Sequence, residues 1–221
     1  MVNVIMFDFI QKEGYHLQNL IDAFETHHLC DNTQGIIINE YSETFLKATY
    51  WHKKMRKGYR FNLEEMNFDT IEEEVISVAD FGIQIEDKKL LVFGNKQMAQ
   101  RIVTLIGIVS KNAYLITEFI ISVKGLVKKI RQKPDIKLIR MKLSDITIEK
   151  GVMVSCMVNL LAQDDPKELA FKYVDNIVTI TFRLKNVESN ITAYKSGKFS
   201  ISKLNGNEKD ELIDSIIQIV R

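Results

Sequence analysis

The sequence has few of the residues that define a protein by a special chemistry. Its two cysteines, Cys30 and Cys156, are too few for a disulfide framework and fit a reducing compartment. Its two prolines, Pro134 and Pro166, exclude a disordered proline-rich linker. The longest uncharged apolar run is about half of the roughly 20 residues that a membrane-spanning helix needs, and the start of the chain lacks the basic segment of a signal peptide. We therefore expect a cytoplasmic protein with no membrane association.

The charge balance excludes a protein that is basic over its whole surface. The chain has 30 Lys and Arg residues against 29 Asp and Glu residues, which gives a net charge of +1. Contact with a polyanion must therefore be local. The sequence also contains neither of the common glycine-rich phosphate-binding loops, Gly-x-Gly-x-x-Gly and Gly-x-x-x-x-Gly-Lys-Ser/Thr. We expect no cofactor.

The most informative feature that is present is an internal duplication. Three pairs of segments match at offsets of 109 to 111 residues: 9–20 with 119–130, 83–93 with 192–202, and 101–109 with 212–220. A repeat of this length indicates a pseudo-symmetric fold and not a solenoid of short units. We expect two repeats, residues 1–110 and 111–221, packed together as one unit.

Each repeat is predicted to contain a strand, a helix, several antiparallel strands and a second helix. Residues 15–27 have apolar side chains at helical spacing, and residues 43–63 are typical of a long hairpin, which we expect to turn near Lys57. Asp165 and Pro166 are typical of an N-cap and a first helical position. Strands that alternate apolar and polar residues bury one face of a sheet under helices. The predicted fold class is α+β, a tandem duplication that forms one curved antiparallel sheet with helices on one face.

This repeated order resembles the saddle of the TATA-binding-protein fold. The resemblance is carried by the twofold repetition and by tight hairpins that lead into a helix, such as residues 190–202 followed by residues 208–220. It implies a single sheet whose polar face binds DNA. The chain has no recognisable counterpart of the paired exposed phenylalanines that these proteins wedge between base steps, so no binding residue is carried over. A sliding-clamp arrangement, also built from helix-and-hairpin repeats, is the architectural alternative.

Residues 47–61 combine cations with aromatic rings, including the only tryptophan of the chain. Cations contact phosphates and release counterions, and flat rings stack on bases. The alternative is an exposed hairpin whose rings pack inward and whose lysines protect an edge strand from pairing. The candidate nucleic-acid-binding residues of this segment are Lys47, Tyr50, Trp51, Lys53, Lys54, Arg56, Lys57, Tyr59 and Arg60.

A second basic cluster follows the start of the second repeat. It comprises Lys124, Lys128, Lys129, Arg131, Lys133, Lys137, Arg140 and Lys142. Lys124, Lys128 and Arg131 are spaced four and three residues apart, so they share one face of a predicted helix, and we add these three to the candidate nucleic-acid-binding residues. The alternative is an ordinary solvated helix face.

Neither of two patterns with metal-binding residue types has the spacing that metal chemistry needs. Asp80 with Glu86 and Lys88 is similar to the Asp…Glu-x-Lys pattern of metal-dependent nucleases, but Glu86 and Lys88 fall on a predicted turn and not within a strand. His27, His28 and Cys30 have no second ligand pair at zinc-site spacing; adjacent helix-end histidines favour contact with terminal carbonyls instead. We therefore expect no metal site and no catalytic residue.

The sequence thus predicts a non-catalytic protein that binds DNA or RNA through the 47–61 hairpin and the polar face of its sheet. One alternative is an interaction or assembly subunit, in which sheet edges pair with further copies of the chain or with another protein. A metal-dependent nuclease is the remaining alternative.

Overall fold

The computed structural model describes residues 1–26, 33–185, 187–203 and 209–220. The chain is an α+β protein, as predicted, and its strands form an open antiparallel sheet that does not close into a barrel. Two compact units are present: Phe9–Ile116, here the first unit, and Met1–Asp8 with Thr117–Arg221, here the second unit. Strand β1 (Val2–Gln11) begins in the second unit and ends in the first. The predicted repeat boundary at residue 110 lies shortly before this division.

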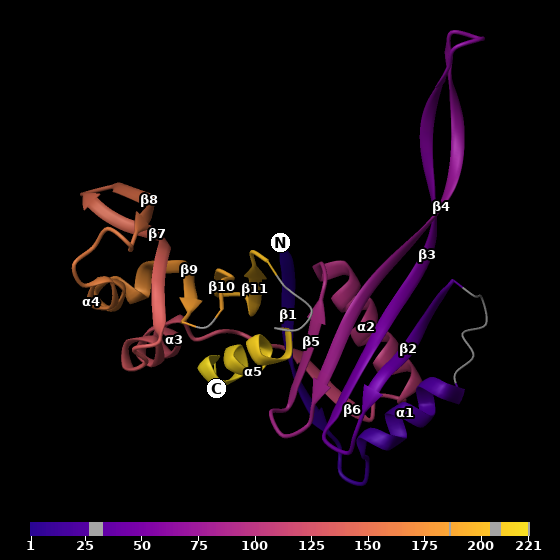
Figure 1. Ribbon diagram of the computed structural model, residues 1–221, viewed down its shortest axis with the longest axis horizontal. Coiled ribbons are helices and arrows are strands. Elements are labelled where there is room, and N and C mark those ends of the chain that lie inside the picture. The colour runs from indigo at the N-terminus through magenta and orange to yellow at the C-terminus, as the bar shows by residue number, and fades with distance from the viewer. Residues whose placement is uncertain (27–32, 186, 204–208, 221) are drawn as a thin grey trace. The chain divides into compact units, whose positions relative to one another are not determined.

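The first unit is an antiparallel sheet with two helices on one face (Figure 1). Leu46, Ala48 and Tyr50 alternate with more exposed residues along β3 and are buried, which defines the helix side of the sheet. Phe24 of α1 packs edge-on against Phe81 of β4 on that side. The elements are β2 (Gln34–Tyr41), β3 (Phe45–Asn62), β4 (Asn67–Gln84) and β5 (Lys89–Phe93), which are neighbours in that order, then β6 (Tyr114–Glu118), α1 (Leu17–Thr26) and α2 (Lys96–Val109).

The hairpin of β3 and β4 is longer than predicted, and the predicted turn near Lys57 is wrong. The two strands pair without interruption from Phe45 with Gln84 to Asn62 with Asn67. The chain reverses between the strands, where the Asn62 side chain accepts the backbone N–H groups of Glu64 and Glu65. An asparagine that bonds to the backbone two residues ahead stabilises a turn, whereas a glycine in a regular ladder does not require one. We call residues 53–76 the arm.

The second unit is also a sheet covered by helices. Leu126, Val127 and Ile130 form the buried face of α3, and Asp165 caps α4 by accepting the N–H of Glu168, as predicted. The strands follow the order β1, β11 (Lys198–Ile201), β10 (Ile191–Tyr194), β9 (Ile177–Leu184), β7 (Ile136–Glu149) and β8 (Val152–Asn159). The helices are α3 (Val123–Gln132), α4 (Pro166–Lys172), the short 3-10 helix η1 (Val174–Asn176) and α5 (Lys209–Val220).

Two of the three pairs of matching segments lie in elements of the same kind, whereas residues 9 and 10 lie in β1 and their matches 119 and 120 lie outside any strand. Residues 83–93 and 192–202 each form a hairpin, β4 with β5 and β10 with β11. Residues 101–109 and 212–220 lie in α2 and α5, the helices that follow these hairpins. The second half has an additional helix, α4, between its strands. The duplication into two equivalent repeats stays a prediction.

Tyr114 is a buried tyrosine in the first unit whose ionisation opposes folding. Its ring stacks on Phe9 with 5.0 Å between the ring centres, and its hydroxyl donates a 2.7 Å hydrogen bond to the backbone oxygen of His16. Burial raises the pKa of Tyr114 to about 12, above its usual value of 10.0. A raised pKa contributes stability that is complete below pH 10 and is lost as the pH rises towards 12.

We therefore expect Tyr114→Phe to change the alkaline stability of the protein. Near neutral pH the variant should be less stable by about 1 kcal/mol, because it lacks one hydrogen bond. Between about pH 10 and about pH 12 it should lose less stability than the wild type, because no phenol has to ionise. Thermal unfolding followed by circular dichroism across this range checks the expectation. Tyr59→Phe, at an exposed tyrosine, is the control, and parallel profiles for Tyr114→Phe and the wild type would contradict it.

Candidate nucleic-acid interface

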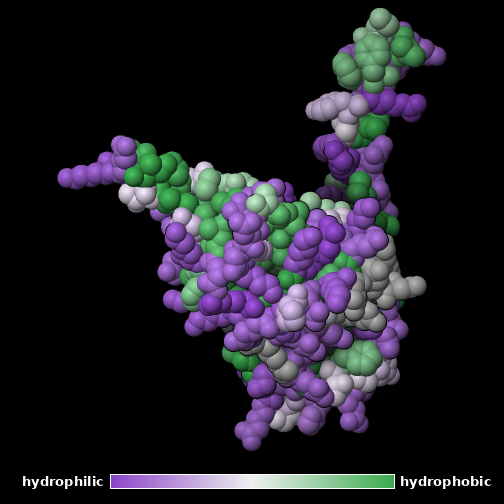
Figure 2. All heavy atoms as spheres, turned by 60° about the vertical axis from the view of Figure 1, so that its left-hand side comes forward, coloured by the Kyte–Doolittle hydropathy of each residue, from purple (hydrophilic) through white to green (hydrophobic). Residues whose placement is uncertain are grey.

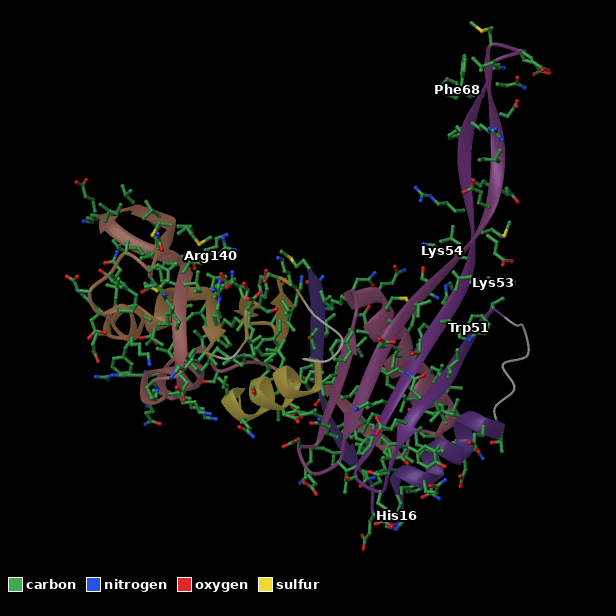
Figure 3. All side chains as sticks on the ribbon, in the orientation of Figure 1. His16, Trp51, Lys53, Lys54, Phe68 and Arg140 are labelled. Carbon is green, nitrogen blue, oxygen red and sulfur yellow. The ribbon has the colours of Figure 1, made fainter. Side chains whose placement is uncertain are left out.

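Side-chain alternation along β3 divides the candidate cations of the arm between two faces. Lys54, Arg56 and Arg60 continue the helix side of the strand, because they are an even number of residues from buried Tyr50. The opposite side of the strand, which carries no helix, is its open side and holds Lys47, Trp51, Lys53, Lys57 and Tyr59. Figure 3 shows Lys53 and Lys54 near the base of the arm and Phe68 near its tip. The candidate cations of residues 47–61 therefore do not share one surface.

The acidic strand β4 faces these cations across the ladder. Lys53 forms an ion pair of 2.8 Å with Glu74, and Lys57 forms one of 3.3 Å with Glu72. On the other side of the arm, two further cation–carboxylate pairs are opposite each other in register: Arg56 with Glu73 and Arg60 with Asp69. Opposite charges directly across an antiparallel pair attract each other. Within the arm, five cations of β3 thus meet four carboxylates of β4, and Glu64 and Glu65 lie in the turn. The arm therefore has no net positive charge.

The tip of the arm is apolar. Tyr59 is 76% exposed, and the rings of Phe61 and Phe68 meet edge-on with 5.1 Å between their centres. Leu63 and Met66 of the turn are also exposed. The space-filling view shows apolar residues gathered there (Figure 2). The tip therefore offers contact area but no concentrated positive charge.

The remaining candidates of the 47–61 segment lie in the body of the first unit. Lys47 forms an ion pair of 3.1 Å with Glu40. Tyr50 is a core residue with an exposed fraction of 0%, and its hydroxyl donates to the Gln34 side chain at 2.7 Å, so its ring has no surface for a base. Burial raises the pKa of Tyr50. Trp51 is partly exposed on the open side, where its indole lies over Gly35 of β2.

The three candidate residues of α3 also differ from one another in exposure and contacts. Lys124 and Lys128 are exposed on the helix. Arg131 forms an ion pair with Glu168 of α4, and its guanidinium lies over the Phe171 ring at 4.9 Å from the ring centre. These contacts give Arg131 a role in joining α3 to α4.

The open face of the second unit brings part of the second basic cluster, Lys137, Arg140 and Lys142, together with two cations from outside that cluster, Arg183 and Lys198. Phe182 and Ile180 of β9 are buried in the core, so Thr181 between them points to the other side of the sheet, where the side chains around it leave it only 3% exposed. Strand pairing extends this position into a row that crosses six strands and contains only polar residues: Asn159, Arg140, Thr181, Thr192, Ser200 and Asn3. Arg140 lies on β7 within this row, and Figure 3 labels it.

Neighbouring rows add further cations on the same face. Lys142 of β7 is opposite Thr179 of β9, and Lys137 is opposite Arg183. Lys198 of β11 lies over the ring of Tyr194 at 5.2 Å from the ring centre. We call Lys137, Arg140, Lys142, Arg183 and Lys198 the cationic face. No residue of these rows is a carboxylate, unlike the partners of the arm cations.

The hydrogen bonds of this face are made by hydroxyl, amide and guanidinium groups. Arg140 donates from Nε to the Thr181 hydroxyl at 3.5 Å, and the hydroxyls of Thr181 and Thr192 are 2.9 Å apart. Arg183 donates from Nε to the Asn190 side chain at 2.9 Å. These contacts use one nitrogen of each guanidinium, and each guanidinium has five N–H donors. The two arginines are therefore oriented by neutral partners, and neither has a carboxylate partner among the described residues.

The two patterns with metal-binding residue types do not form a metal site among the described residues. Asp80 accepts a 2.9 Å hydrogen bond from Thr49 within the sheet, whereas Glu86 and Lys88 lie in the turn between β4 and β5. No group of three or more His, Cys, Asp or Glu residues in the described part of the chain is arranged to hold a metal ion. His27, His28 and Cys30 lie outside the described residues. Of the described helices, none combines the length and the apolar character that crossing a bilayer requires.

Comparison with known proteins gives no family for this chain. No protein-family model matches it, and no curated protein matches its sequence. The functional argument therefore rests on the geometry of its own residues.

The close approach of Trp51 to Gly35 predicts a spectroscopic change. A Cβ atom at position 35 would lie 2.5 Å from Nε1 of the indole, so Gly35→Ala must displace the ring. We expect a red-shifted emission from the single tryptophan and a loss of about 1–3 kcal/mol of stability, as for other overpacked sites. Gly58→Ala is the matched control, because its nearest contact would be an ordinary 3.5 Å to Ile71. Unchanged emission from Gly35→Ala would show that the indole does not lie on this glycine.

Proposed function

We propose that the protein is a non-catalytic nucleic-acid-binding protein and that it binds the ligand on the open face of its second unit. The observation that carries the proposal is the cationic face, in which five Lys and Arg residues lie in paired rows with hydroxyl and amide groups, and these rows of described residues contain no carboxylate. Uncompensated cations are the groups that neutralise phosphates and release counterions. Hydroxyl and amide side chains commonly donate to phosphate oxygens.

Two further features of the face support a nucleic-acid ligand. Tyr194 presents an aromatic ring among the cations, which is the combination that single-stranded nucleic acids bind. The Ser200 hydroxyl is buried on the same face and, within the described residues, has no hydrogen-bond partner. A buried hydroxyl without a partner is unfavourable, but Ser200 is only 4% exposed, so a ligand oxygen reaches it only after neighbouring side chains move.

The arm is the less favourable surface on electrostatic grounds. Phosphates that approach Lys53 or Lys57 must compete with Glu74 and Glu72, which already pair with these lysines. Each such exchange replaces one anion with another and gains little. The predicted contacts of the arm thus rank second to those of the cationic face in this proposal.

The resemblance to the TATA-binding-protein fold is part of the proposal and not its basis. The order strand, helix, strands, helix occurs from β1 to α2 and, with α4 and η1 inserted between its strands, from β6 to α5. This order is compatible with the saddle that the resemblance implies. The choice of the cationic face depends only on the residues of that face.

A second candidate function is that of an assembly subunit that pairs through its sheet edges. The observation that favours it is the composition of β8, an edge strand of eight residues that has no charged side chain. Such an edge is a template for pairing with another strand. This candidate does not exclude nucleic-acid binding, because the edge and the open face are different surfaces.

The proposal predicts that removing cations from the open face weakens binding in a salt-dependent way. The variant Arg140→Ala/Lys142→Ala/Arg183→Ala should bind fluorescein-labelled oligonucleotides more weakly than the wild type. The slope of log affinity against log salt should fall by about 2–3, since each phosphate that the variant no longer neutralises lowers it by about one. Fluorescence anisotropy with single-stranded and duplex probes, between about 50 and about 200 mM salt, measures both quantities.

The matched control removes the same charge from the arm. Lys53→Ala/Lys54→Ala/Lys57→Ala should keep most of the affinity and of the salt slope, because two of these lysines are paired with carboxylates. If the arm variant loses binding and the face variant does not, the ligand contacts the arm. If the wild type shifts neither probe at low salt, the protein is not a nucleic-acid-binding protein.

A further inference from the structure

Strand β8 is an edge strand without the usual protection against pairing. Among the described residues it pairs only with β7, and it ends the strand order of the second unit. Its sequence, Val-Met-Val-Ser-Cys-Met-Val-Asn, contains no charge and no proline. Met153 and Met157 are 68% and 58% exposed. An exposed, apolar edge strand of this length presents unpaired backbone donors and acceptors to any strand that matches it.

Other free edges of the same chain are protected. In the arm, β3 and β4 extend past the ends of their neighbours β2 and β5 and form a two-stranded ribbon. Outside the turn, the arm has nine charged residues between positions 53 and 76. The edge strand β2 has a register shift between Ile38 and Glu40, and Glu40 is charged. Charges and bulges are the common devices that prevent strand addition. The ladder of β7 with β8 also has two register shifts, but their extra residues lie in β7. The absence of charge and of extra residues from β8 itself points to a strand that is kept available for a partner.

The direction of the backbone groups of β8 fixes which residues bond to a partner. The Leu160 N–H donates to the Ile139 oxygen of β7 at 3.0 Å. Because backbone groups alternate along a strand, the N–H groups of Met153, Ser155 and Met157 point away from β7. An antiparallel partner must therefore bond to these odd-numbered residues, and two copies of β8 can meet only in registers that pair odd residues with odd residues.

We propose that β8 pairs antiparallel with β8 of a second copy of this chain, about a twofold axis at Cys156. This proposal deepens the assembly candidate and is independent of nucleic-acid binding. The register matches Val154 with Val158, so apolar residues meet on the core side of the strand. It also places Val152 opposite Leu160, which follows the strand and is fully buried. On the other side it matches Ser155 with Met157. β8 has no charged residue, so this register brings no like charges together.

The self-matching sequence is the reason for choosing a second copy as the partner. A twofold contact requires one surface to be complementary to itself. Around Cys156, the residues two positions away on either side are both valines, and those four positions away are Val152 and Leu160. An unrelated strand would have to supply this uncharged apolar pattern, whereas a second copy supplies it by symmetry. The second units of the two copies would then share one continuous sheet.

The first test is the mass of the protein in the absence of nucleic acid. The wild type should show a concentration-dependent dimer of twice 25.6 kDa in light scattering after size exclusion. Met157→Lys should shift the protein to the monomer, because a lysine on an edge opposes strand pairing. Met66→Lys at the exposed arm tip is the matched control and should leave the dimer intact. A wild type that stays monomeric at every concentration tested, or a Met157→Lys variant as dimeric as the wild type, would overturn the proposal.

The second test is a crosslink that reads the register. In the proposed pairing, Cys156 is directly opposite Cys156 of the second copy at a position without hydrogen bonds, where Cα atoms approach to about 4.5 Å, within the range that a disulfide spans. Oxidation of the Cys30→Ser variant, in which Cys156 is the remaining cysteine, should therefore give a disulfide-linked dimer with diamide. In Cys30→Ser/Cys156→Ser/Ser155→Cys, each new cysteine faces Met157 and should crosslink at least tenfold more slowly. Faster crosslinking at position 155 than at 156 would show that this register is wrong.

Neither test depends on the outcome of the oligonucleotide measurements. The Met157→Lys variant keeps all five residues of the cationic face and adds a lysine directly opposite Lys142 on the same side of the sheet. It should therefore bind nucleic acid as a monomer, at least as tightly as the wild type, if the proposed function is correct. Loss of the dimer with retained binding separates the two surfaces. A folded circular dichroism spectrum for Met157→Lys confirms that the change of mass reflects the edge and not unfolding.

Discussion

The alternation of side chains along antiparallel strands is the constraint on which the functional surfaces of this protein depend. Each strand that buries every second residue under helices must present the others on the open side. On β3 this rule separates neighbouring cations, so that Lys53 and Lys54 lie on opposite sides of the arm. On β7 and β9 the same rule brings Arg140, Lys142 and Arg183 together on one side. The distribution of charge over surfaces is thus a property of the sheet and not of the local sequence.

Cross-strand pairing then decides which of these charges remain uncompensated. The arm combines a basic strand with an acidic strand in register, and its ion pairs stabilise a ribbon that has little other support. The open face of the second unit pairs its cations with threonine, asparagine and serine. Two segments of similar basic composition therefore have different electrostatic roles, the first structural and the second available to a polyanion.

Much of the local structure is predictable, because it depends on neighbouring residues. Asp165 and Pro166 mark the start of α4, and the spacing of Leu17 and Leu20 indicates a helix. The turn of the arm lies several residues beyond the predicted position, because Gly58 belongs to a regular ladder although glycine is common in turns. The Asn62 side chain, which forms the turn, is the signal in the sequence that identifies its true position.

The amino-acid sequence by itself determined the fold class, the helix caps and the uncharged character of β8, because these follow from residues close to one another in the chain. Only the tertiary structure decided that Tyr50 is buried, that the arm lysines have carboxylate partners, and that Arg183 joins Arg140 on one face. These relations connect residues 15 to 43 positions apart through strand register. Register is set by the packing of the whole sheet, and no local pattern encodes it.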